Sequence, residues 1–142
     1  MILPDVNLLV HSYNLESPLH PRARAWWEEL LNGDRAVGLA WVAILGFIRL
    51  TTNRQILAYP FTAAQACEHV RTWLARPNVA ILHPGDRHAG ILFGLFDAVG
   101  TAANLTTDAH LAALAIENQT DLHSTDADFV RFSGLRWTNP LA

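Results

Sequence analysis

The sequence predicts an α/β fold, with a central parallel sheet of four to five strands flanked by helices. Short apolar runs alternate along the chain with longer segments of helical periodicity, which is the pattern of strands that alternate with helices in a covered parallel sheet. The length of 142 residues suits one folded unit with one hydrophobic core. We therefore expect a single domain that spans residues 1–142.

The first half of the chain predicts two strands and four helical segments. The apolar opening suits a buried strand, and the next residues have the apolar spacing of a first helical turn. Asn32-Gly33 is a plausible helix end, and Thr62 can cap a later helix that ends before Pro77. The expected elements are a strand at 1–5, a helical turn at 6–10, a helix at 22–31, a strand at 37–40, and helices at 41–51 and 62–74.

The second half continues the alternation with two strands, a possible edge strand and three helical segments. An alanine- and leucine-rich stretch begins at Asp108, and a threonine before it is available as the helix N-cap. Residues 100–107 are expected to form a loop. The expected elements are a strand at 79–82, a helix at 86–99, a helix at 108–117, a strand at 122–124, a short helix at 126–132 and an edge strand at 135–137.

The composition is that of an ordinary globular protein, with 51% hydrophobic and 16% charged residues. The single cysteine, Cys67, excludes an internal disulfide and fits a reducing compartment. The longest apolar stretch, 37–47, is interrupted by glycines and is shorter than the roughly 20 residues that cross a bilayer. The amino terminus has no basic region of a secretory signal. We expect a cytoplasmic protein with no membrane partner.

All ten basic residues are arginines, and the absence of lysine excludes several classes of site. A P-loop, a Schiff-base enzyme and a phosphoacceptor receiver domain each need a lysine. The formal net charge of −3 gives no signature of a basic protein. A nucleic-acid partner would therefore have to be held by local arginines and by contacts between metal ions and phosphate.

Four acidic residues are predicted to stand where a strand gives way to a helix: Asp5, Asp108, Asp126 and Asp128. In an open α/β sheet such positions converge at the carboxyl ends of the strands. Clustered carboxylates repel each other, and a divalent cation held by oxygen ligands relieves that repulsion. We therefore expect Asp5, Asp108 and Asp126 to bind Mg²⁺ or Mn²⁺.

Each acid also has a purely structural interpretation. Asp5 suits the N-cap of the following helix, and Asp108 suits a first helical turn, where the helix dipole favours a negative charge. Asp126 and Asp128 suit a turn that leads into a helix. A pair of histidines or cysteines at zinc-binding spacing is missing, so a zinc site is not expected.

Four segments, in this order, make the chain resemble the PIN-domain ribonucleases, and among them the VapC toxins of bacterial toxin–antitoxin pairs. They span nearly the whole chain, and the ending at 132–137 is similar to the closing segment of one branch of these toxins. The segments are Leu3-Pro4-Asp5-Val6-Asn7-Leu8-Leu9, residues 41–53 (Trp41 to Asn53), residues 104–115 (Asn104 to Ala115), and Ser124-Thr125-Asp126-Ala127-Asp128-Phe129.

The resemblance implies a PIN domain that cleaves structured RNA such as tRNA or rRNA as an endoribonuclease dependent on Mg²⁺ or Mn²⁺. Asp5, Asp108 and Asp126 match the first, third and fourth acids of the family, with Asp128 as an accessory carboxylate. The second family acid is a glutamate, and Gly46 stands at its position here. This leaves open whether one or two metal ions bind. A degenerate PIN module, which binds RNA or a protein partner without cleavage, is the alternative.

Three further residues are candidates for supporting roles. Asn7 can orient Asp5 or a water, or simply begin a helix. Thr125 can hold a carboxylate, or be a plain hydroxyl at a strand end. Arg49 can meet a phosphate with its bidentate guanidinium, or lie in solvent at a helix end.

Asn7 also helps to exclude a competing enzyme class. A haloacid-dehalogenase-like phosphatase needs a second aspartate at the position of Asn7 and a lysine, so that class is excluded.

The resemblance also implies partners. They are the RNA substrate, a small cognate antitoxin protein and a second copy of the chain in a homodimer. One side chain of the pair Trp26 and Trp27 is expected to face a partner, because one helix stripe is too narrow to bury both.

Overall fold

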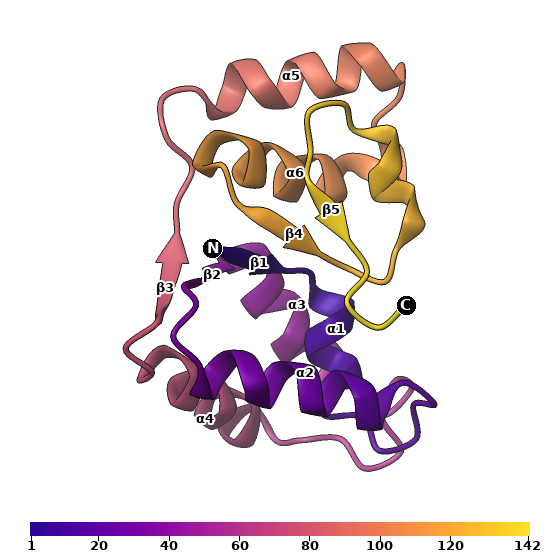
Figure 1. Cartoon of the computed structure of the whole chain (residues 1–142). Coiled ribbons are helices and arrows are strands. Elements are labelled where there is room, and N and C mark those ends of the chain that lie inside the picture. The colour runs from indigo at the N-terminus through magenta and orange to yellow at the C-terminus, as the bar shows by residue number, and fades with distance from the viewer.

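Five parallel strands form one sheet in the computed structural model, which describes all 142 residues (Figure 1). The strand order is β3-β2-β1-β4-β5, with β1 at the centre. The predicted α/β class and parallel sheet are confirmed. The strands are β1 Ile2–Pro4, β2 Val37–Ala40, β3 Val79–Leu82, β4 Asp121–His123 and β5 Trp137–Thr138.

Helices cover both faces of the sheet. In Figure 1, α1 to α4 lie on one side, whereas α6 lies against the other side with α5 stacked outside it. None of these helices is long and apolar enough to cross a membrane. The helices are α1 Val6–His11, α2 His20–Asn32, α3 Trp41–Thr51, α4 Ala63–Leu74, α5 His88–Val99 and α6 Thr106–Asn118, and two 3₁₀ turns are η1 Ala103–Leu105 and η2 Ala127–Arg131.

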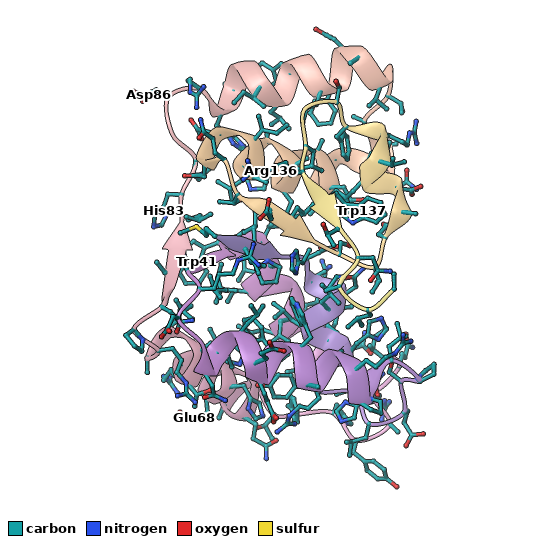
Figure 2. The ribbon with its side chains drawn as sticks, in the orientation of Figure 1. Trp41, Glu68, His83, Asp86, Arg136 and Trp137 are labelled. Atoms are coloured by element: carbon teal, nitrogen blue, oxygen red, sulfur yellow. The ribbon has the colours of Figure 1, made fainter.

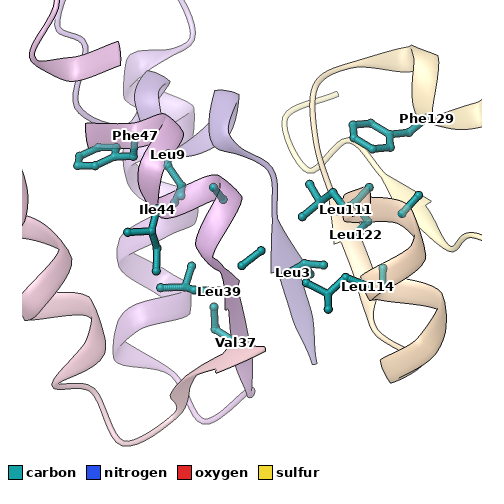
Figure 3. Packing of buried hydrophobic residues seen from close by; sticks show 14 of the residues in the cluster. Leu3, Leu9, Val37, Leu39, Ile44, Phe47, Leu111, Leu114, Leu122 and Phe129 are labelled. Carbon is teal, nitrogen blue, oxygen red and sulfur yellow. The ribbon is translucent and has the colours of Figure 1, made fainter. Parts of the chain in front are cut away.

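The core lies on both sides of β1, whose three residues are all buried. A strand buried on both faces is apolar throughout and does not alternate, which explains the sequence Ile2-Leu3-Pro4. Figure 3 shows Leu39 and Ile44 on one side of β1, and Leu114 and Leu122 on the other. The end of β1, where Asp5 follows, is therefore fixed by packing from two directions.

Helix α6 is buried on several sides because it lies between the sheet and α5. Its alanines at 109, 112, 113 and 115 are all fully buried, and Leu111 and Leu114 pack among them. A helix that is apolar around most of its circumference is an interior helix. This packing sets the position of its first turn, which contains Asp108.

The structure confirms several element boundaries and moves others. Strands 37–40 and 79–82 and helix 41–51 lie where they were predicted, and Thr62 forms a capping box with Gln65. Helix α2 begins earlier, at His20, because Pro21 is tolerated in a first helical turn. The last strand is Trp137–Thr138, later than the predicted 135–137.

The segment before Asp108 differs more from the prediction. The expected loop contains η1, and α6 already begins at Thr106. Its N-cap is Leu105, which makes no side-chain capping bond, so the predicted threonine cap is wrong. Asp108 consequently follows a 3₁₀ turn and stands in the first turn of α6, not directly at the end of a strand.

The two adjacent tryptophans do not form an exposed patch. Trp27 is fully buried, in edge-on contact with Trp73, and Trp26 is half-buried with its indole Nε1 donating to His123 Nδ1 at 3.2 Å. The exposed large apolar side chains lie elsewhere, and they include Leu45 on α3 and Phe93 on α5. Trp27 is therefore not available to a partner, and the expectation that one of the two tryptophans faces a partner stays a prediction for Trp26.

Candidate active site

Asp5 lies at the junction between β1 and α1 and is only 7% exposed. Its backbone N–H donates to the carbonyl oxygen of His123 at 2.8 Å, which ties this junction to β4. The Asp5 carboxylate accepts the N–H of Val6 at 2.7 Å, so the residue is also the N-cap of α1. Burial raises the pKa of Asp5, and two hydrogen bonds to its carboxylate oppose that rise.

Ser124 connects the acids at the end of β4, and it is completely buried. Its hydroxyl donates to Asp5 Oδ2 at 2.7 Å and accepts the backbone N–H of Asp126 at 3.0 Å. The Ser124 carbonyl accepts the indole N–H of Trp137 at 3.0 Å, and Figure 2 places Trp137 on β5 beside this segment. A hydroxyl that joins two carboxylate-bearing segments fixes their relative position, and the sequence prediction did not identify it.

Asn7 is also held by Ser124. Its Nδ2 donates to Ser124 Oγ at 3.3 Å. This orientation of the amide is required because the hydroxyl has already given its only proton to Asp5, so it can only accept from Asn7. The Asn7 Oδ1 atom is then buried with no hydrogen-bond partner. A buried carbonyl oxygen without a donor is rare and suits a cation.

Asp126 follows β4 and N-caps η2, where its Oδ1 accepts the backbone N–H of Asp128 at 2.9 Å. The structural interpretation of this segment, as a turn that leads into a helix, is therefore confirmed. One carboxylate oxygen of Asp126 is engaged in the cap. Asp128 is exposed at the start of η2.

Asp108 shows that the four acids gather at one edge of the sheet. Its pKa is raised to about 6, first by burial and then by the charges of Asp5, Asp126 and Asp128. Residues separated by more than a hundred positions in the chain thus act on one carboxyl group. The structure brings Asp5, Asp126 and Asp128 near enough to Asp108 for their charges to act on its carboxyl group.

The acids gather without forming a finished ligand cage. No three or more histidine, cysteine, aspartate or glutamate side chains are arranged closely enough to hold a metal ion. Asp5 Oδ1 and Oδ2 are directed to Val6 and Ser124 and not to the other acids. The donor set itself fits a hard divalent cation, because it offers carboxylates beside the unpartnered Asn7 oxygen.

The remaining candidates take different positions. Thr125 is in none of the contacts that join the acids, which are made by Ser124 next to it. Glu117, an acid farther along α6, accepts the N–H groups of Gly85 and Arg87 and so lies at the start of α5, away from the acids. Arg49 lies in the last turn of α3 and is exposed.

Gly46 and Arg49 border a pocket of about 420 Å³ beside the acids. Val6 and Thr107, the chain neighbours of Asp5 and Asp108, also line this pocket. A Cβ atom at Gly46 would lie 2.9 Å from Val6 Cγ2, so a glutamate at this position requires the Val6 side chain to move. The glutamate of the family pattern and the valine at position 6 therefore compete for the same space.

Replacing Ser124 by alanine is expected to lower both stability and the function of the site. The change leaves a buried Asp5 oxygen and the Asn7 amide without their partner, which costs about 2 kcal/mol of unfolding free energy. Urea unfolding measures that loss. Ser133→Ala is the control, because Ser133 is exposed. A Ser124→Ala protein as stable as the wild type would contradict the role of the Ser124 hydroxyl.

The fold and the site together define a PIN-domain protein, with a parallel α/β sheet that gathers aspartates from β1, α6 and the end of β4. The chain is 48% identical over 141 residues to Ribonuclease VapC33 of Mycobacterium tuberculosis, with 99% of each chain covered. It is 42% identical over 142 residues to Ribonuclease VapC37 of the same organism, covering 100% of this chain and 99% of the relative. The chain therefore belongs to the VapC ribonuclease family.

Solved structures agree on the fold. The chain superposes on VapBC2 from Rickettsia felis bound to a promoter DNA fragment with a TM-score of 0.67 at 15% identity, covering 98% of both chains. VapBC-1 from nontypeable Haemophilus influenzae gives a TM-score of 0.64 at 16% identity, with both chains fully covered. No protein-family profile matches the chain.

Proposed function

We propose that this protein is the toxin of a VapBC-type toxin–antitoxin pair and an endoribonuclease dependent on Mg²⁺ or Mn²⁺. The observation on which this rests is that Asp5, Asp126 and Asp128 lie near enough to Asp108 for their charges, after burial, to contribute to raising its pKa to about 6. Groups with strongly perturbed pKa values in one place are typical of functional sites. Membership of the VapC ribonuclease family supplies the reaction class, which is hydrolysis of RNA phosphodiester bonds.

Asp5, Asp108 and Asp126 would hold the cation, with Asp128 as an accessory carboxylate and Asn7 Oδ1 as a further oxygen. When bound, the ion supplies Lewis-acid stabilisation of the charge that develops on the phosphate oxygens. Gly46 supplies no carboxylate at the position of the second family acid, so the number of bound ions, one or two, is left open.

The protein's own residues prepare the site for a polyanionic substrate. Val6 N–H and Ser124 Oγ fix the Asp5 carboxylate in one orientation before substrate arrives, which avoids reorganisation during the reaction. Arg49 makes no ion pair with any carboxylate, so its guanidinium is available to a phosphate. Thr125, which precedes Asp126 in the chain, has a weaker supporting role in holding a carboxylate. Structured RNA such as tRNA or rRNA is the proposed substrate.

The purified protein tests this proposal on total RNA. We expect discrete cleavage fragments in Mn²⁺ or Mg²⁺, none in EDTA, and recovery of cleavage when the ion is restored. RNA that binds but is never cut under any of these conditions would show that the protein is a degenerate PIN module. That is the alternative suggested by Gly46 at the position of the second family acid.

Divalent ions should also stabilise the protein measurably. Binding relieves the repulsion among the acids, and at 100 times its dissociation constant an ion adds about 2.7 kcal/mol to the unfolding free energy. For a chain of this size that corresponds to a rise in Tm of roughly 10 °C. Thermal unfolding in EDTA and in Mn²⁺ measures it. Asp34→Asn, in the exposed loop before β2, should respond like the wild type. An unchanged Tm in the wild type would contradict the metal site.

We further propose a small antitoxin whose carboxy-terminal segment lies across the acids and presents an arginine to them. The solved VapBC and FitAB complexes that share this fold support a partner of this kind. Co-expression with a small protein encoded next to this chain tests the proposal. Co-purification of the two, with loss of cleavage, is expected; a neighbour that neither binds nor inhibits would contradict it.

A homodimer is proposed as well, with α5 as the surface that pairs. Helix α5 is strongly apolar, yet only His88 and Leu95 among its residues are buried, and Phe93 is 62% exposed. An apolar helix on the outside of a protein is typical of an interface. Sedimentation of the wild type and of Phe93→Glu tests this. A wild-type monomer would contradict it.

A further inference from the structure

We propose that the pocket between α1, α3 and the start of α6 binds the nucleobase of the RNA nucleotide next to the cleaved phosphate. This inference rests on the proposed ribonuclease function and adds a base-binding subsite to it. The volume of about 420 Å³ lies in the range of small-molecule sites, roughly 300–1,000 Å³. Six residues line the pocket: Val6, Val42, Leu45, Gly46, Arg49 and Thr107.

The pocket is joined to the acids through the chain itself. Val6 follows Asp5 directly, and Thr107 precedes Asp108, so two of the walls are neighbours of two proposed metal ligands. A nucleotide whose phosphate lies at the acids therefore has its base or its neighbour's base within reach of these walls. A site placed elsewhere on the surface would have no such connection to the reaction.

Gly46 is the point at which Val6 of α1 packs directly against α3, and both residues line the pocket. A Cβ atom at position 46 would come within 2.9 Å of Val6 Cγ2, so a larger residue there would displace the Val6 side chain. The residue that departs from the family pattern thus removes an acid and, at the same place, lets Val6 form an apolar wall of the pocket. We interpret the departure as an exchange of a carboxylate for this apolar wall.

The chemistry of the walls fits a base attached to a phosphate. Val6, Val42 and Leu45 offer apolar contact to an aromatic ring, and the Thr107 hydroxyl can hydrogen-bond a base edge. Arg49 stands at the same pocket without a carboxylate partner, so it can neutralise a flanking phosphate or stack on the base. An apolar pocket with an unpaired guanidinium at its edge is complementary to a base that carries a phosphate, which favours RNA as the occupant.

Titration of the ¹³C-methyl-labelled full chain with the four nucleoside 5′-monophosphates tests the inference directly. The methyl resonances of Val42 and Leu45 should shift on addition of at least one nucleotide. Ribose 5-phosphate, which has the phosphate and no base, should bind at least tenfold more weakly. Equal binding of ribose 5-phosphate would show that Arg49 binds an anion only, and it would overturn the base pocket.

Variants connect the pocket to cleavage. Val42→Phe fills the pocket, and Leu45→Ala, at a side chain that is 60% exposed, removes a wall without affecting the core. Each should lower kcat/KM for RNA at least tenfold and change which nucleotide flanks the cut, whereas Leu15→Phe, in the loop after α1, should not. Leu45→Ala keeps the test valid if Val42→Phe fails to fold.

The outcomes separate this inference from the proposed function. If the wild type cleaves RNA and both pocket variants cleave with unchanged rate and sequence preference, the base pocket is wrong and the ribonuclease stands. If the wild type does not cleave, the ribonuclease itself is wrong. If the variants lose binding of a co-purifying antitoxin while nucleotide binding and cleavage persist, the pocket belongs to the antitoxin, which also overturns the inference.

Discussion

Asp5→Asn is expected to reduce RNA cleavage by about 10³-fold while the protein stays folded. Loss of one metal-binding carboxylate removes several kcal/mol of stabilisation from the reaction, and about 4 kcal/mol corresponds to 10³ in rate. The asparagine oxygen can still accept the N–H of Val6, so the N-cap of α1 is retained. The amide nitrogen that replaces Asp5 Oδ2 cannot accept the proton of the Ser124 hydroxyl, which costs about 1 kcal/mol of unfolding free energy. Removal of a buried charge whose pKa is already raised offsets part of that cost.

Initial cleavage rates on one RNA, with circular dichroism and Tm as controls for folding, measure this effect. Asp34→Asn is the matched control, because it makes the same chemical change in the exposed loop before β2 and should leave the rate unchanged. Asp5→Asn with more than a tenth of the wild-type rate would show that Asp5 is only the N-cap of α1.

Asp108→Asn is expected to act in opposite directions on activity and on stability. Cleavage should fall as far as with Asp5→Asn, since Asp108 is a proposed ligand of the same ion. In EDTA at pH 7.5, however, the variant should be more stable than the wild type by about 1 kcal/mol, a value that allows for solvent screening of a half-buried group. A gain in stability with a loss of function is typical of a site built from repelling charges.

The stability difference should depend on pH with a defined sign. Asp108 has a pKa of about 6 in the folded protein and an ordinary value of 3.8, so between these values the folded state binds more protons. The wild type therefore loses stability relative to Asp108→Asn as the pH rises from 4 to 7, and the difference disappears below about pH 4. Urea unfolding in EDTA at pH 4 and 7.5 measures it. A difference that stays constant would contradict the coupling.

Much of the fold follows from the sequence for simple physical reasons. Buried parallel strands are continuously apolar, so β2 and β3 have the predicted bounds, and the capping box of α4 is visible in Thr62 and Gln65. The proximity of Asp5 and Asp126 was also predictable, because each follows a strand of one parallel sheet, whereas Asp108 lies in the first turn of α6. Whether these three acids are the metal ligands stays a prediction.

Other features depend on tertiary contacts that local pattern does not encode. Ser124 looked less important than Thr125, and only the pairing of β1 with β4 places its hydroxyl against Asp5. The start of α6 was missed because Leu105 is held by packing and not by a side-chain cap. Trp27 is buried because α2 packs it against Trp73 of α4, a contact between distant elements.

Sequencing of RNA 5′ ends from cells that express the wild type or Asp5→Asn tests most directly whether the protein is a ribonuclease that depends on its acids. We expect new 5′ ends at a small set of positions in structured RNA with the wild type, and none of them with Asp5→Asn at equal protein levels. The same new ends in both samples, or none in either, would contradict an acid-dependent ribonuclease.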